Sequence, residues 1–148
     1  LRREESMKFQ PHYADQGDHL RLKASWTKGG KERTVPIRTE AQRELLNRLH
    51  KKVGKASLIP ANRTYVQQMK IYERSTKAAG LGKCHALRHQ YAQDRYLELS
   101  GMLAPKAGGK SSKELTPEEK ARDYQARLTI SSELGHGREQ ITAQYLGR

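Results

Sequence analysis

Hydrophobic and polar residues alternate most clearly over residues 20–27, where leucine, alanine and tryptophan occupy every second position. A period of two predicts a strand with one buried face. The following Lys28-Gly29-Gly30-Lys31 predicts a hairpin turn, and residues 32–37 predict the partner strand. Pro36 confines that partner to a sheet edge, because proline has no backbone N–H to donate. The pattern therefore predicts a small antiparallel sheet.

Elsewhere the apolar residues recur at steps of three and four, which predicts amphipathic helices. These predicted helices cover residues 1–10, 40–52, 62–79, 85–99 and 117–134, and a last short one covers 138–146. Two of them begin with a capping box, formed by Thr39 with Gln42 and by Thr116 with Glu119. The sequence therefore predicts an α+β fold that is mostly helical.

Three segments carry more specific expectations. Pro11 and the polar residues after it predict the end of the first helix and a loop. In the helix over 85–99, Leu87, Tyr91 and Leu99 are the expected inner stripe. Residues 100–116 are rich in Gly, Ser and Lys, so we expect a mobile insertion loop with almost nothing to bury.

Composition limits the partner and the compartment. The 148 residues contain 29 Lys and Arg against 16 Asp and Glu, and a length of this size predicts one domain. So large a positive excess most often serves a polyanion, which makes nucleic acid the first expected partner. No apolar run is long enough for a spanning helix, and the single Cys84 fits a reducing compartment. We therefore expect a cytoplasmic, nucleoid-associated protein with no membrane contact.

Five short motifs follow one another along nearly the whole chain. They are, in order, Leu1-Arg2-x-x-Glu5, Lys28, His85-x-x-Arg88, Leu134-Gly135-His136 and Tyr145. Together they resemble the catalytic domain of the tyrosine recombinases, the family of the phage-type integrases. The most specific stretch is residues 133–145, in which Tyr145 follows His136 by nine residues. Arg88 and His136 are separated by 47 residues, which is more than is usual in this family. This long spacing resembles that of the integrases of integrative elements.

The resemblance implies DNA strand cleavage and rejoining by a tyrosine nucleophile, with no metal and no cofactor. Tyr145 would attack the scissile phosphate and form a 3′-phosphotyrosyl bond. Arg2 and Arg88 would stabilise the charge that gathers on the nonbridging oxygens. Lys28 would protonate the leaving 5′-oxygen as a general acid.

The resemblance also gives roles to three supporting groups. His85 would act as the base for the phenol, whose reference pKa near 10 keeps it protonated at neutral pH. His136 would donate a hydrogen bond to a nonbridging oxygen, and Glu5 would be the carboxylate that orients its neighbours. Lys31 lies in the same turn as Lys28 and stays an alternative general acid.

The resemblance extends to partners and to the extent of the chain. It implies duplex DNA with attachment sites, self-association in a tetrameric synaptic complex, and accessory proteins that set direction. We expect the chain to be a fragment whose upstream DNA-gripping domain is absent. Two alternative functions stay open: a type IB topoisomerase activity, and a non-catalytic basic module that binds nucleic acid.

Overall fold

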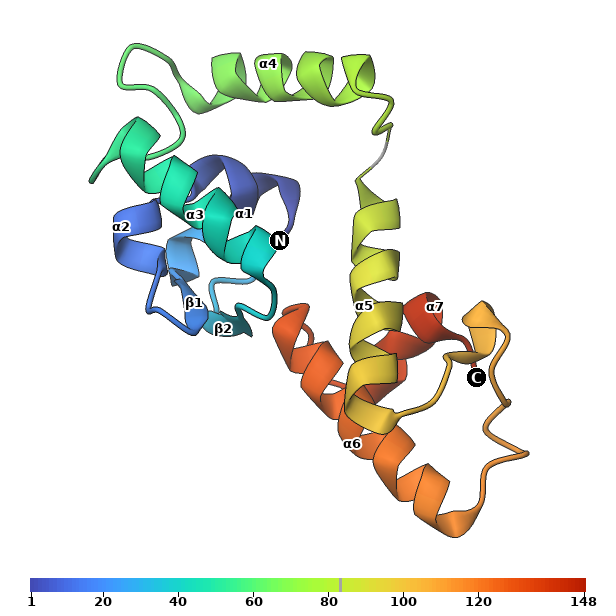
Figure 1. Cartoon of the computed structure of the whole chain (residues 1–148). Coiled ribbons are helices and arrows are strands. Elements are labelled where there is room, and N and C mark those ends of the chain that lie inside the picture. The colour runs from blue at the N-terminus through green and yellow to red at the C-terminus, as the bar shows by residue number, and fades with distance from the viewer. Residues whose placement is uncertain (83) are drawn as a thin grey trace. The chain divides into compact units, whose positions relative to one another are not determined.

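A computed structural model describes residues 1–82 and 84–148 of the chain (Figure 1). The described residues form two compact units, an N-terminal unit over Leu1–Gly82 and a C-terminal unit over Lys83–Arg148. Helices dominate both units, and the described strands form a two-stranded antiparallel sheet. The predicted α+β, mostly helical class is confirmed.

The sheet of the N-terminal unit is shorter than its sequence pattern predicts. Strand β1 (His19–Leu22) pairs with β2 (Arg33–Pro36) in the predicted antiparallel arrangement. The predicted continuation of the first strand to residue 27 is wrong, because Ala24–Trp26 form a 3-10 turn, η1. That turn carries the Trp26 ring into the core, where it contacts the rings of Phe9 and Tyr13.

Four helices accompany the hairpin in the N-terminal unit: α1 (Arg3–Lys8), α2 (Pro11–Ala14), α3 (Glu40–Val53) and α4 (Tyr65–Ala78). The predicted end of the first helix before Pro11 is confirmed. The predicted loop starts only after Ala14, because Pro11 opens α2 at a position that needs no backbone N–H. The capping box predicted for α3 is present, and α3 ends at Gly54. Helix α4 is capped by Thr64 and has no buried residue.

A buried carboxylate joins two of these helices. The side chain of Asp15, at the end of α2, accepts hydrogen bonds from Arg43 and lies 2.7 Å from His50 Nε2, both on α3. The hydrogen bonds from Arg43 are the main cause that lowers the pKa of Asp15 well below its usual range. The ion pair therefore holds α2 and α3 together around the apolar core formed by Phe9, Ala14, Leu22, Trp26 and Leu46.

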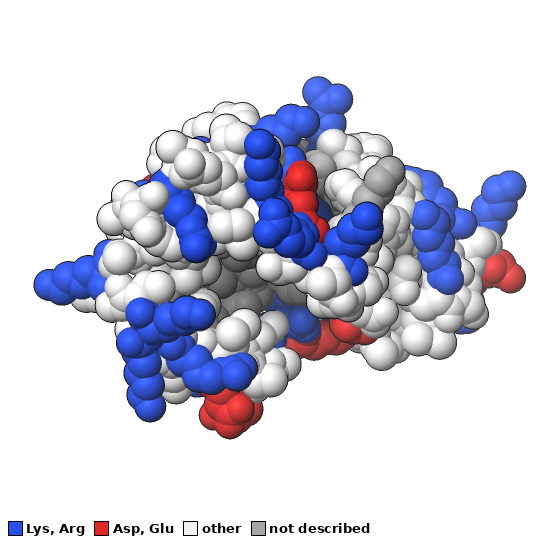
Figure 2. Space-filling view, turned by 90° about the horizontal axis from the view of Figure 1, so that it is seen from above, with Lys and Arg blue, Asp and Glu red and all other residues white. Residues whose placement is uncertain are grey.

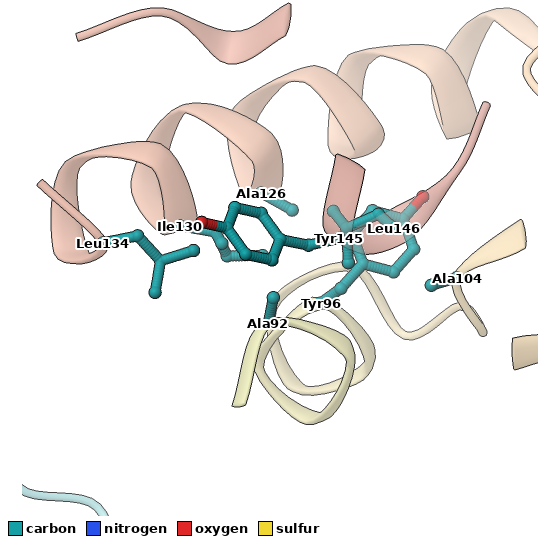
Figure 3. Close-up of a cluster of buried hydrophobic side chains, with 8 residues drawn as sticks. All are labelled: Ala92, Tyr96, Ala104, Ala126, Ile130, Leu134, Tyr145 and Leu146. Carbon is teal, nitrogen blue, oxygen red and sulfur yellow. The ribbon is translucent and has the colours of Figure 1, made fainter. Parts of the chain in front are cut away.

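The C-terminal unit packs two long helices against a short terminal one. Its elements are α5 (His85–Ser100), η2 (Pro105–Ala107), α6 (Pro117–Glu133), η3 (Glu139–Thr142) and α7 (Ala143–Leu146). The predicted capping box at the start of α6 is present, with Pro117 at the first helical position. Between α5, α6 and α7 lies an apolar cluster that includes Tyr145 (Figure 3).

The inner face of α5 differs from the predicted stripe. Leu87 is 53% exposed and Leu99 38% exposed, and Tyr91 is only partly buried. The residues that are buried instead follow one another at steps of four: Arg88, Ala92, Tyr96 and Ser100. Three of these are polar, and each of the three is hydrogen-bonded inside the unit. Because most of these buried residues are polar, apolar periodicity in the sequence does not reveal this face.

Residues 100–116 also bury more than the sequence predicts. Ala104 is 1% exposed and belongs to the apolar cluster, and Leu115 is 7% exposed. The Lys106 ammonium donates to the backbone carbonyl of Gln144 at 2.5 Å. This segment therefore packs against α7, the short helix that carries Tyr145. Within the described parts of the chain, no helix combines the length and the apolar character needed to cross a membrane.

Candidate active site

The predicted site residues are divided between the two units. Arg2, Glu5 and Lys28 belong to the N-terminal unit, and His85, Arg88, His136 and Tyr145 belong to the C-terminal unit.

His136 is positioned by the way α6 ends. Gly135 has a φ of 78°, the left-handed conformation that ends many helices and that glycine adopts without a steric penalty. The amide of Gly135 donates to the carbonyl of Ser132, and the amide of His136 donates to that of Ser131. These two bonds are a Schellman motif. The glycine between Leu134 and His136 therefore turns the chain directly after α6 and fixes the histidine there.

Tyr145 lies on α7 with its side chain in the core. The residue is 6% exposed, and its ring extends from α7 toward the end of α6 that carries Leu134 (Figure 3). His136 Nε2 lies 3.3 Å from the phenolic oxygen, within hydrogen-bonding distance. The predicted histidine and tyrosine are therefore adjacent in the structure, although nine residues separate them in the sequence.

Arg88 approaches the same tyrosine from α5. Its guanidinium carbon lies 6.0 Å from the centre of the Tyr145 ring, and Nη2 donates to the carbonyl of Leu134 at 2.7 Å. The residue is 6% exposed, and Nη1 has no hydrogen-bond partner among the described residues. A buried donor without a partner costs free energy unless an acceptor reaches it. The Nη1 group of Arg88 is therefore available to donate to an anion beside Tyr145.

His85 differs from the other three residues in its surroundings. It is the first residue of α5 and is exposed, one turn before Arg88. Where the structure is described, it makes no hydrogen bond or ring contact with Tyr145. The imidazole that does contact the ring is His89, with the ring centres 5.0 Å apart in an edge-on arrangement. The sequence predicted no role for His89, which lies one turn after His85 on α5.

In the N-terminal unit, Glu5 organises the start of the chain. Its side chain is fully buried and forms an ion pair with Arg33 of β2, whose Nη2 donates at 2.7 Å. It also accepts the backbone N–H of Arg2 at 2.6 Å, and the Arg2 guanidinium lies 3.7 Å from it. Glu5 therefore holds Arg2 through its backbone amide and lies close to its guanidinium. Arg33 was not predicted, because its pairing with Glu5 joins distant parts of the sequence.

Lys28 lies in the tight turn between η1 and β2 and is exposed. The turn is closed by the Gly30 amide, which donates to Thr27, and by the Thr27 hydroxyl, which donates to the carbonyl of Lys31 at 2.7 Å. Both Lys28 and Lys31 project from this turn region with exposed side chains. The geometry of the turn does not separate the two lysines as candidates for the general acid.

Charge is distributed unequally between the two units. The N-terminal unit contains 18 Lys and Arg against 8 Asp and Glu, whereas the C-terminal unit contains 11 against 8. Blue Lys and Arg side chains are spread over the face drawn in Figure 2, and red Asp and Glu side chains are fewer. Most of the positive excess, and therefore most of the electrostatic attraction for a polyanion, belongs to the N-terminal unit.

Among the described side chains, no group of three or more His, Cys, Asp and Glu could hold a metal ion. Comparisons with protein-family models, with curated proteins and with solved structures give no match.

The Glu5 ion pair predicts how the stability of the N-terminal unit depends on pH. Burial alone would raise the pKa of the Glu5 carboxyl, but hydrogen bonds from Arg33 and from the Arg2 amide lower it below its ordinary value of 4.5. A lowered folded-state pKa contributes stability above that ordinary value, and this stability is lost as the pH falls further. We therefore expect the free energy of unfolding to decrease below about pH 4.5.

Glu5→Gln should lower the free energy of unfolding by about 3 kcal/mol at pH 7, because it leaves Arg33 with a neutral partner in a buried site. Its loss of stability in acid should also be smaller than that of the native chain. Urea unfolding followed by the fluorescence of Trp26, the single tryptophan, reports on this unit. Glu4→Gln is the matched control, since Glu4 is half-exposed in its pair with Lys8. Equal effects of the two substitutions would contradict the prediction.

Proposed function

We propose that this chain carries the catalytic residues of a site-specific tyrosine recombinase. One observation carries the proposal: His136 and the partly unpartnered, buried Arg88 lie beside the hydroxyl-bearing ring of Tyr145. A phenol, an imidazole and a guanidinium are the nucleophile, the hydrogen-bond donor and the charge clamp that transfer of a phosphodiester to tyrosine needs. The ordered motifs in the sequence support the same function.

In the proposed reaction, the phenolic oxygen of Tyr145 attacks the phosphorus of the scissile phosphodiester. The bond from phosphorus to the 5′-oxygen breaks, and a 3′-phosphotyrosyl ester forms. Because the ester keeps the energy of the broken bond, a 5′-hydroxyl from another strand can attack it and restore DNA without ATP. The Tyr145 side chain is buried, so the phosphate has to approach the hydroxyl edge of the ring, where His136 lies.

Negative charge accumulates on the nonbridging oxygens during this step. Arg88 offers its free Nη1 group at that place, and His136 offers a ring nitrogen. A guanidinium is suited to this task, because it is permanently charged and presents its donors in a planar fork. Arg2, held by Glu5, is the second proposed clamp. His136 is the histidine adjacent to the phenol, and the role of His85 as base stays a prediction.

The leaving 5′-oxygen needs a proton as its bond to phosphorus breaks. An exposed lysine in the turn after η1 could supply it, and we assign this role to Lys28, with Lys31 as the alternative. The proposed substrate is duplex DNA at attachment sites in the nucleoid, bound through the basic N-terminal unit. Synapsis in a tetramer and direction set by accessory proteins belong to the same proposal.

Tyr145→Phe should abolish covalent capture of DNA without weakening binding. The ring still fills the core, and only the phenolic oxygen and its contact with His136 are lost. The test uses a pool of nicked duplexes of random sequence, and measures protein–DNA adducts that resist SDS. Tyr124→Phe on α6 is the control, since this tyrosine is 50% exposed and belongs to the same unit. Adducts formed by Tyr145→Phe at the native level would contradict the assignment.

The same assay distinguishes the alternative functions. A non-catalytic module would bind the pool with steep salt dependence and yield no adduct with any variant. The 18 cations of the N-terminal unit would be sufficient for such binding. A type IB topoisomerase would form the adduct through Tyr145 and relax supercoiled plasmid, but would not exchange strands between two duplexes.

The assignment of the general acid can be tested with a better leaving group. The duplexes captured above define the cleavage position, and sulfur is then placed at the 5′-bridging atom there. Lys28→Ala should slow cleavage of the ordinary DNA by about 100-fold or more, because the alkoxide leaves without a proton. It should cleave the sulfur-containing DNA at the native rate, since a thiolate leaves without protonation. Lys31→Ala is the matched variant, and this pattern in Lys31→Ala alone would transfer the role to Lys31.

A further inference from the structure

Arg127 on α6 is the largest side chain that is fully buried in the described part of the chain. Its Nε donates to Asp123 at 2.8 Å, and Asp123 also accepts the hydroxyl of Tyr96 at 2.6 Å. Burial and this hydrogen bond raise the pKa of Tyr96 above its usual range, so the hydroxyl stays a donor. The ion pair with Asp123 neutralises the buried guanidinium and leaves its two terminal nitrogens available for other contacts.

Those two nitrogens contact the chain on both sides of Tyr145. Nη1 donates to the hydroxyl of Thr142 at 3.3 Å, and Nη2 donates to the carbonyl of Gly147 at 3.0 Å. The Thr142 hydroxyl in turn donates to the carbonyl of Glu139 at 2.6 Å. One guanidinium therefore contacts both the residue before α7 and the residue after it.

Helix α7 depends on such contacts because it is only four residues long. A helix this short leaves most of its carbonyl groups without partners inside the helix. Side chains from other elements supply them: Gln93 of α5 donates to the carbonyl of Tyr145 at 3.2 Å, and Lys106 of η2 to that of Gln144. Arg127 differs from Gln93 and Lys106 because it contacts both ends of α7 and is fully buried.

We propose that Arg127 is a positioning residue for the nucleophile: its guanidinium, held by Asp123, fixes α7 so that the phenolic oxygen of Tyr145 stays beside His136 and Arg88. The inference rests on the proposed function for its catalytic consequence. The structural part of the proposal, that Arg127 sets the position of the Tyr145 ring, can be tested whether or not the protein cleaves DNA. Arg127 does not touch the reacting atoms and acts through the backbone of α7.

Two substitutions of the full chain remove these contacts in different ways. Arg127→Lys keeps the charge beside Asp123, but one ammonium cannot also reach both Thr142 and Gly147. Thr142→Val keeps the shape of the side chain and removes the hydroxyl that accepts from Arg127, whereas Thr142→Ser keeps that hydroxyl. Arg122→Lys is the matched control on the same helix, since the exposed Arg122 donates to the carbonyl of Ser100 and, among the described residues, makes no hydrogen bond to α7 or to the residues that flank it.

Two measurements are made on each variant. With fluorotyrosine in place of tyrosine, fluorine NMR should give a resonance for Tyr145 that is assigned by its loss in Tyr145→Phe. That resonance should shift or broaden in Arg127→Lys and in Thr142→Val, and should stay at its native position in Thr142→Ser and Arg122→Lys. The single-turnover rate of adduct formation should fall by about 10- to 100-fold in the first two variants, with DNA affinity and the amplitude of the reaction unchanged.

The outcomes separate the positioning role from general stability and from the proposed function. A merely structural role would lower the amplitude, which measures the folded fraction, and leave the rate constant of the remaining protein unchanged. A native resonance and a native rate in Thr142→Val would overturn the proposal, even if Arg127→Lys fails to fold. A displaced resonance in a chain whose native form yields no adduct would support the positioning role and contradict the recombinase function instead.

Discussion

The ion pair between Arg127 and Asp123 is the interaction on which the C-terminal unit depends. Both of its residues lie on α6. The pair is linked to α5 by the hydroxyl of Tyr96, to the turn before α7 by Thr142, and to the residue after α7 by the carbonyl of Gly147. Only 34% of the residues in the chain are hydrophobic, so polar side chains have to occupy part of the interior. A charged group in the interior costs free energy unless partners offset the loss of its hydration. Thr142 and Gly147, which Arg127 contacts, flank the helix that carries Tyr145.

The same constraint operates in the N-terminal unit with other residues. Glu5 pairs with Arg33 across α1 and β2, and Asp15 pairs with Arg43 across α2 and α3. Each pair joins an early helix to an element that comes much later in the chain. A buried ion pair is a weak source of net stability, but the loss of one partner is costly, so such pairs favour a single arrangement of the elements. The position of Arg2 is fixed through Glu5 in this way.

Local signals in the sequence were sufficient for much of the fold and for part of the site. Capping boxes in the sequence predicted where α3 and α6 begin, because the two residues of each box are only three positions apart. Gly135 and the spacing of His136 from Tyr145 identified the pair that the structure brings together. Long-range polar contacts were not accessible in the same way. The buried face of α5 is largely polar, and Arg33 and Arg127 are two of 29 cations that composition cannot distinguish.

Arg88 differs in its partners from two other arginines of the C-terminal unit. In the C-terminal unit 11 cations face 8 anions, and the partly buried Arg95 and the buried Arg127 are paired with Glu133 and Asp123. Arg88 is also buried, yet its described hydrogen bond is to a neutral carbonyl. No described carboxylate neutralises it through an ion pair, and its guanidinium carbon lies 6.0 Å from the centre of the Tyr145 ring. An anion that entered there would gain the interaction that the fold leaves unmade, whereas a nearby carboxylate would have removed that gain.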